Sequence, residues 1–156
     1  MLTIVTGEET EILRKKAAKV KDPTSEEMKT LIPEMVRTMR KAEGVGLAAP
    51  QVGLSIRLCV IEQGGAISVF FNPKITSMSK ETTISEEGCL SLPGEFFPIV
   101  RSEKITVRYD DAAGNPQKLK ADGFLAIVLQ HEIDHLEGIL IINRFREQRK
   151  KHLYAL

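Results

Sequence analysis

The sequence predicts an α+β fold, with small antiparallel sheets packed around a central buried helix, an N-terminal helix and a C-terminal helix. Three observations predict it: an amphipathic helical segment near the start, a middle of short strand-like segments, and a later helix-length segment that begins with an apolar run. Because the strand-like segments come together before the central helix and do not alternate with helices, the order favours α+β over a parallel α/β arrangement.

The first helix is expected in Ser25–Ala42, where apolar residues recur at helical spacing and would form one buried stripe. These residues are Met28, Leu31, Ile32, Met35, Val36 and Met39. Thr24 and Glu27 fit a capping box at its start, and Gly44 is a stop signal after its end. Pro33 lies inside the pattern, which predicts a kink or a late helix start.

The middle of the chain contains five short segments with strand-like patterns. They are Ile56–Ile61, Ser68–Phe71, Lys74–Ser77, Thr82–Ser85 and Ile105–Tyr109. Asn72-Pro73 and Ala113-Gly114-Asn115 are the expected breaks between strands.

The central helix is expected from Phe124 to Leu136, with Asp122 as its cap and Gly138 after its end. Its first half, Phe124–Leu129, is apolar all round, which is typical of a helix buried in a core. Arg144–Leu156 has the pattern of a basic, amphipathic terminal helix.

The composition is that of an ordinary globular chain, and its 156 residues suit one domain, 1–156. Apolar residues make up 42% and the net charge is +1, so composition gives no reason for a membrane or a specific nucleic acid as partner. The first residues do not read as a secretory signal. Two cysteines form no disulfide framework, which indicates a reduced compartment: the cytoplasm, or an organelle if a transit peptide has been removed.

The strongest chemical signal is the segment His131-Glu132-Ile133-Asp134-His135. Histidines at i and i+4 lie on one face of a helix, so both imidazoles can reach a single ion, which would make the central helix metal-binding. Glu132 would lie beside them, close enough to accept a proton from water. The alternative is a chance pair of surface histidines. The apolar residues upstream argue against it, because buried polar groups without partners are costly.

A catalytic ion needs three protein ligands and an open position. In the extended metalloprotease pattern the third ligand follows the helix, but Ile141 occupies that position here. Glu137 and Glu147 are the only downstream carboxylates. The third ligand is therefore expected upstream.

Cys89 is the upstream candidate, in the polar segment Glu86-Glu87-Gly88-Cys89-Leu90-Ser91. Most free cysteines are small buried hydrophobes, which suits Cys59 between two apolar residues but not Cys89. A thiolate is a strong metal ligand. Glu87 is either a hydrogen-bond partner of a ligand or substrate, or a solvated loop carboxylate.

The segment Gly44–Gln51 is small, apolar and adjacent to a helix, and it lacks the lysine and spacing of a phosphate loop. It is either a tight turn packed on the core or a backbone edge, Gly46 included, against which a peptide could lie. Gln51 is its one side chain able to donate a hydrogen bond.

Together, Gly-Val-Gly-Leu-Ala-Ala-Pro-Gln, Glu-Gly-Cys-Leu-Ser and Gln-His-Glu-Ile-Asp-His resemble, in this order, the three signature motifs of the peptide deformylases. The resemblance extends to Leu13-Arg14 and to Arg101. It implies an α+β enzyme that hydrolyses the formyl group from the N-terminal formylmethionine of nascent polypeptides and releases formate. It also implies one divalent ion, with Fe²⁺ expected in the cell and Zn²⁺, Ni²⁺ or Co²⁺ as alternatives.

The resemblance also implies roles for residues at the matching positions. Cys89, His131 and His135 would hold the ion, and Glu132 would be the catalytic proton carrier. The Gln51 side chain and the Leu90 backbone N–H would stabilise the developing oxyanion. Gly46, Glu87 and Arg101 are expected to contribute to substrate binding.

Helical geometry adds an apolar slot for the methionine side chain. Phe124, Ile127 and Val128 precede His131 by seven, four and three residues, on its own helix face. Val45 would complete the slot. Plain core packing is an equally good reading of Phe124.

Three other classes of protein remain in view. An endopeptidase would use the same His-Glu pattern but lacks its downstream ligand. A metal-stabilised binding module needs a fourth ligand, and His152 lies in the basic tail. An RNA-binding or ribosome-binding protein would use the cluster Arg144, Arg146, Arg149, Lys150 and Lys151, which also suits a solvated helix face with little aromatic interleaving. A transient ribosome contact through this C-terminal helix remains an expectation.

Overall fold

The computed structural model describes residues 1–151, and it confirms the α+β prediction. The helices are α1 (Glu26–Lys41), α2 (Gly123–Leu136) and α3 (Ile141–Lys150), with short 3-10 turns η1 (Glu11–Arg14) and η2 (Ala49–Val52). The strands are β1 (Gly46–Ala48), β2 (Leu58–Gln63), β3 (Ala66–Met78), β4 (Thr82–Cys89), β5 (Leu92–Ser102), β6 (Lys104–Asp110) and β7 (Pro116–Asp122).

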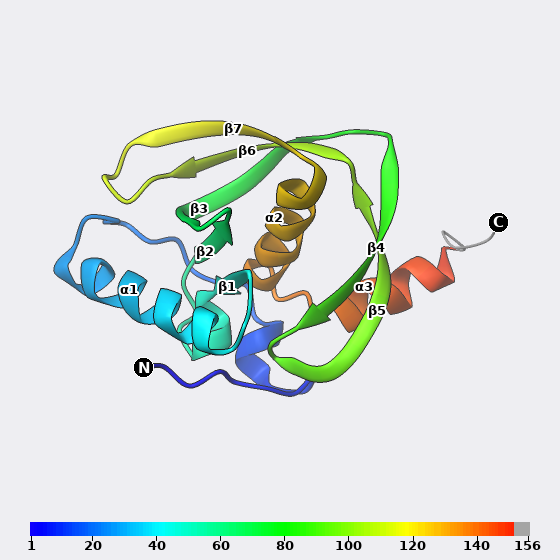
Figure 1. Ribbon diagram of the computed structural model, residues 1–156, viewed down its shortest axis with the longest axis horizontal. Helices are drawn as coiled ribbons and strands as arrows, with labels where there is room; N and C mark the ends of the chain where they lie inside the picture. Colours follow the sequence, from blue (N-terminus) through cyan, green and yellow to red (C-terminus); the bar gives the residue numbers. More distant parts are fainter. Residues whose placement is uncertain (152–156) are drawn as a thin grey trace.

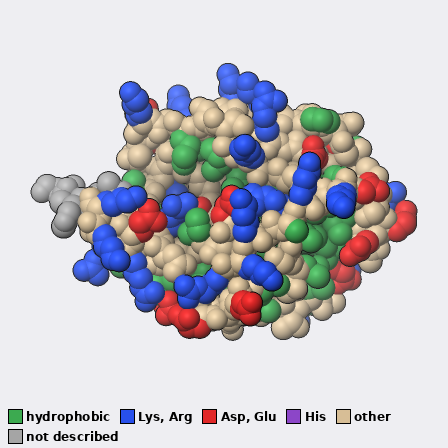
Figure 2. All heavy atoms as spheres, turned by 180° about the vertical axis from the view of Figure 1, so that it is seen from behind, with side chains coloured by type: hydrophobic (Ala, Val, Ile, Leu, Met, Phe, Trp, Pro, Cys, Tyr) green, Lys and Arg blue, Asp and Glu red, His purple; other side chains and the backbone are tan. Residues whose placement is uncertain are grey.

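Two antiparallel sheets surround α2 (Figure 1). One has five strands in the order β1-β2-β3-β6-β7, and the other is the two-stranded ribbon β4-β5. In Figure 1 the ribbon lies beside α2 and runs down to α3, while α1 lies on the far side of β1 and β2. Seen from behind, the molecule carries lysine, arginine and acidic side chains over its surface (Figure 2).

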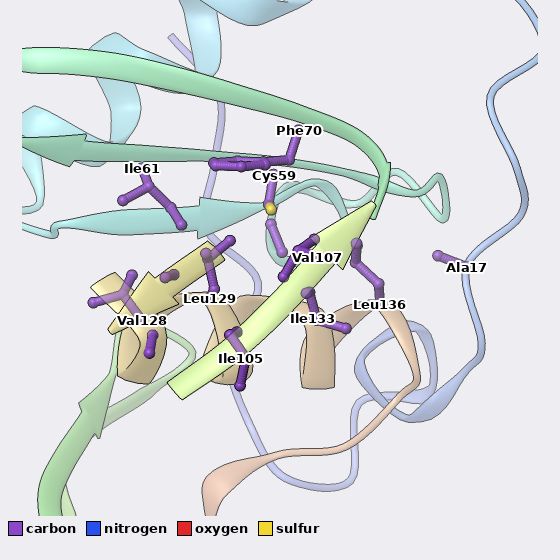
Figure 3. Close-up of a cluster of buried hydrophobic side chains, with 13 residues drawn as sticks. Ala17, Cys59, Ile61, Phe70, Ile105, Val107, Val128, Leu129, Ile133 and Leu136 are labelled. Atoms are coloured by element: carbon purple, nitrogen blue, oxygen red, sulfur yellow. The ribbon is translucent and has the colours of Figure 1, made fainter. Parts of the chain in front are cut away.

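The core has three parts, and each holds one helix in place. α2 packs on one face of the five-stranded sheet through Leu129, Ile133 and Leu136, which meet apolar residues such as Phe70 and Val107 (Figure 3). The stripe of α1 packs on the other face of β2 and β3. A third cluster joins α3 to β5 and η1. Alternating side chains bury both faces of β2, and of β3 at Phe70 and Phe71, which explains the apolar runs there.

The limits of α1 differ from the prediction. Ser25, not Thr24, is the N-cap, and its side chain accepts a hydrogen bond from the Met28 N–H at 3.3 Å. The Thr24 hydroxyl instead donates to Asp22. The helix continues through Pro33, so the late start was wrong. At the other end Glu43, and not Gly44, takes the left-handed conformation, with φ of +59°.

The other predicted strands are longer than expected, β2 keeps its predicted length but starts two residues later, and three strands were missed. Ser68–Phe71 and Lys74–Ser77 belong to one strand, β3, in which Asn72-Pro73 shifts the register without ending it. β4 continues to Cys89, so this cysteine ends a strand. β1, β5 and β7 were not predicted: β1 has only three residues, β5 contains Pro93, Gly94 and Pro98, and β7 is a polar edge strand.

The helix α2 matches the prediction closely. Asp122 occupies its N-cap position, but the side chain makes no capping hydrogen bond. α3 begins at Ile141, three residues before Arg144, and residues 152–156 of the predicted C-terminal helix, including His152, lie outside the described residues. No helix within residues 1–151 is long and apolar enough to span a membrane.

Gly138 joins α2 to the N-terminal segment, and Gly138→Ala is expected to destabilise the fold. Gly138 has φ of +74°, and a Cβ there would lie 2.6 Å from the backbone carbonyl of Arg14. Gly53→Ala is the matched control, because Gly53 has φ of +86° but open space around it. Alanine is strained at both positions because both have a left-handed backbone conformation. The overlap of the new Cβ with the Arg14 backbone should lower the free energy of unfolding of Gly138→Ala by about 1–3 kcal/mol more. Urea unfolding of the two variants measures the difference, and equal losses would contradict it.

Candidate active site

The C-terminal half of α2 and the end of β4 bring three metal-ligand side chains together. The ligand atoms of Cys89, His131 and His135 all lie within 4.8 Å of one another. Cys89 Sγ is 3.4 Å from His135 Nε2. The helix supplies the two histidines one turn apart, and the β4-β5 ribbon carries the cysteine to them. A thiolate with two imidazoles is a donor set that suits a transition-metal ion.

The electrostatics of the site favour a positive charge between these ligands. Burial alone would raise the pKa of the Cys89 thiol, but the charge of His135 and hydrogen bonds from both histidines lower it to about 5. Burial opposes a charge on His131, yet its hydrogen bonds to Cys89 and Glu87 raise its pKa to about 10. Cys89 is therefore a thiolate, the form that binds metals. The residues present fit a divalent cation.

Glu132 is buried against β1. Burial raises the pKa of its carboxyl group, and its Oε2 atom has no hydrogen-bond partner among the described residues. A Cβ on Gly46 would lie 2.5 Å from Glu132 Oε1, so only glycine lets β1 approach this closely. A buried carboxylate oxygen without a partner is costly, so Glu132 is a candidate for a chemical role beside the clustered ligand side chains.

Gln51 lies in η2, directly beside the thiolate. Its Oε1 atom accepts a hydrogen bond from the Ala48 N–H at 3.0 Å, which fixes the amide. Its Nε2 atom donates to Ser91 Oγ at 3.2 Å and to Cys89 Sγ at 3.7 Å. The side chain is thus a fixed donor at the metal site.

A chain of hydrogen-bonded charged side chains runs from α3 to His131. Arg144 donates two hydrogen bonds to Asp134, and Arg101 Nη1 donates to Asp134 Oδ2 at 2.7 Å. Arg101 also binds Glu87 through two hydrogen bonds, at 2.8 and 2.9 Å. Glu87 Oε1 is 3.0 Å from His131 Nδ1. This contact leaves His131 Nε2 free to face an ion.

Sequence reasoning missed Asp134 and Arg144 as members of this chain. The available signal was Asp134 itself, a carboxylate between the two histidines on a helix that was expected to be buried. Such a group needs a cationic partner, but the sequence does not show which arginine supplies it.

A cavity of about 480 Å³ opens beside the ligands. It is lined by most of the predicted site residues: Val45, Gly46, Gln51, Glu87, Cys89, Leu90, Phe124, Ile127, Val128, His131 and Glu132. Arg101 is absent from the lining and its side chain is 3% exposed, so the structure does not place it at the cavity with the other predicted residues. Its guanidinium is engaged by two carboxylates instead. Phe96, which sequence reasoning did not select, lines the cavity from β5.

Comparison with known proteins decides the family. A family model described as Polypeptide deformylase matches residues 1–151. The chain belongs to this family. Enzymes of the family use a metal ion to remove the formyl group from N-formylmethionine hydrolytically, and the chain is a metal-dependent hydrolase of this kind.

Individual relatives agree over most of the chain. It is 47% identical over 137 residues to the peptide deformylase of Dictyoglomus turgidum, covering 88% of each chain. It is 48% identical over 135 residues to peptide deformylase 1 of Clostridium perfringens, covering 85% of this chain and 90% of that protein.

Solved structures share the fold. The peptide deformylase of Thermotoga maritima superposes with a TM-score of 0.89 at 42% identity, covering 93% of this chain and 97% of that chain. The enzyme of Synechococcus elongatus in complex with actinonin gives 0.89 at 39% identity, covering 98% and 84%.

Proposed function

We propose that the chain acts as one catalytic domain that deformylates nascent polypeptides, with Cys89, His131 and His135 as its metal ligands. The observation that carries this proposal is the convergence of the three ligand atoms within 4.8 Å at the cavity, with the carboxylate of Glu132 beside them. Fe²⁺ is the proposed ion in the cell. Thiolate and imidazole ligands also suit Zn²⁺, and Ni²⁺ or Co²⁺ are further alternatives.

The bound ion would supply a Lewis acid that polarises the formyl carbonyl and makes water a nucleophile near neutral pH. Glu132 takes the proton of the attacking water and delivers it to the amine that leaves with the methionine. Its buried position suits this exchange, because burial raises the pKa of the carboxyl group and makes it a better proton acceptor.

The negative charge that develops on the formyl oxygen needs hydrogen-bond donors. The fixed Nε2 of Gln51 and the backbone N–H of Leu90, both in the cavity lining, take this role. Glu87 orients His131 through its hydrogen bond to Nδ1. Arg101 orients Glu87 in turn, so it acts on the site without touching the substrate.

The methionine side chain occupies the apolar part of the cavity. Ile127 and Val128 lie one turn before His131 on α2, and Val45 and Phe124 stand at the solvent side, 47% and 56% exposed. Partly exposed apolar side chains beside a cavity gain contacts when a ligand covers them. The backbone of β1 at Gly46 offers an edge along which the peptide can lie.

The test uses protein purified without oxygen and measures formate release from a formyl-Met peptide. A second assay measures cleavage of internal peptide bonds in a peptide of the same sequence without the formyl group. Deformylation without internal cleavage is expected. Internal cleavage as the main reaction would support an endopeptidase and overturn the proposal.

Gln51→Ala is expected to lower kcat by about a hundredfold, because one fixed donor to the oxyanion is removed. Metal content should stay the same, since Gln51 is no ligand. Steady-state formate release and metal analysis of the same sample measure both effects. An unchanged kcat would remove Gln51 from the reaction.

We further propose a cytoplasmic location and a transient ribosome contact through α3. The helix carries Arg146, Arg149 and Lys150 on its exposed surface, beside Arg144. Cosedimentation with ribosomes, with and without charge-removing changes in α3, tests the contact.

A further inference from the structure

The five-stranded sheet carries an unusual row of positive charges on the part of its outer face beyond α1. Along β6 the inward residues Ile105 and Val107 pack on α2, so Lys104 and Arg108 point away from it. Register places Lys74 and Lys118 directly beside Arg108 on the two neighbouring strands. Lys120 lies beside Thr106 on β7.

These five cations, Lys74, Lys104, Arg108, Lys118 and Lys120, form the basic sheet face, and all are exposed. Within residues 1–151, none of them forms an ion pair. The acidic residues nearby lie at its margins: Asp122 is opposite Lys104, and Asp110 accepts a hydrogen bond from Asn72. Like charges directly opposite on neighbouring strands destabilise a sheet, so this arrangement favours an anionic partner.

The face also offers hydroxyl groups. A hollow of about 320 Å³ on it has three hydroxyl side chains, two lysines and one carboxylate among its lining residues: Ser77, Ser79, Thr106, Lys104, Lys120 and Asp122. Hydroxyls and ammonium groups are the side chains that contact phosphate oxygens in nucleic-acid complexes. In the view from behind, lysine and arginine side chains gather along the upper edge of the molecule, where β6 and β7 lie (Figures 1 and 2).

We propose that the basic sheet face binds the phosphate backbone of double-helical RNA. The face has no aromatic side chain on which unpaired bases could stack, which argues for a duplex over a single strand. The five cations and the hydroxyls provide no large apolar anchor of the kind that protein interfaces and membrane-bound surfaces need. The choice of RNA rests on the proposed function, because nascent chains are still attached to the RNA-rich particle that makes them.

The test compares two triple variants that remove the same charge. Lys74→Gln/Arg108→Gln/Lys118→Gln neutralises the basic sheet face, and Lys15→Gln/Lys19→Gln/Lys21→Gln neutralises three exposed lysines of the N-terminal segment. Binding to a fluorescein-labelled RNA hairpin is measured by anisotropy over a series of salt concentrations. Anionic phospholipid vesicles and poly-glutamate serve as alternative anions. Formate release from a formyl-Met peptide checks that each variant is folded and active.

The sheet variant is expected to bind the hairpin at least about tenfold more weakly, with a salt dependence lower by about one unit per cation removed. The N-terminal variant should stay within about twofold of the wild type in this assay. Equal weakening by both variants would overturn the proposal, because net charge alone would then account for binding. Tighter binding to vesicles or poly-glutamate than to RNA, or no RNA binding by the wild type, would overturn it too. If the wild type releases no formate, that result counts against the proposed function and not against RNA binding by the basic sheet face.

Discussion

Glu132→Gln is expected to bind metal as the wild type does and to lose about 10²–10⁴-fold in kcat. The amide keeps the size of the carboxylate but cannot accept and return a proton. Glu132 is not among the three clustered ligand side chains, so the ion should remain. A purely structural role does not explain this carboxylate, because its Oε2 atom has no hydrogen-bond partner among the described residues.

Glu95→Gln is the matched control, since Glu95 also lines the cavity but belongs to the exposed part of β5. It should release formate at close to the wild-type rate. Metal analysis and formate release on the same preparations separate loss of the ion from loss of proton transfer. A Glu132→Gln enzyme with near-normal kcat would refute the role given to this carboxylate.

Arg101→Met is expected to lower the free energy of unfolding by about 3–5 kcal/mol. The Arg101 side chain is 3% exposed and lies between Glu87 and Asp134, which are 6% and 11% exposed. Without it, two buried carboxylates lose a cationic partner, although Asp134 keeps Arg144 and Glu87 keeps its contact with His131. The second expected effect is weaker metal binding, because Glu87 no longer holds His131 firmly.

Arg40→Met provides the control for charge removal alone. Arg40 also holds a carboxylate, Glu62, through its Nε and Nη2 atoms, but on the surface, where its own side chain is 52% exposed. Exposed pairs contribute little, so this variant should unfold close to the wild type. The free energy of unfolding of both variants is measured in urea. Similar decreases in the two variants would show that burial of the Arg101 side chain does not strengthen its ion pairs.

The helices and the ligands were predictable because their signals are local. The stripe of α1, the apolar first half of α2 and the spacing of His131 and His135 each lie within one stretch of sequence. Cys89 could be selected because its polar surroundings do not suit a buried apolar cysteine, in contrast to Cys59, which lies fully buried in the core.

The parts that escaped prediction depend on contacts between distant segments. β5 and β7 exist because neighbouring strands pair with them, and pairing overrides the prolines of β5 and the polar composition of β7. The partners of Arg101 escaped prediction for the same reason. Only the folded chain shows that Asp134 and Glu87, 47 residues apart, both face this guanidinium.

The most direct measurement is the metal content per chain of protein purified without oxygen, for Cys89→Ala against Cys59→Ala. Cys59 is the other free cysteine and belongs to the core, away from the clustered ligands. One ion per chain is expected in the wild type and in Cys59→Ala, and a clear deficit in Cys89→Ala. A Cys89→Ala protein that keeps one tightly bound ion per chain would contradict the assignment of the metal site.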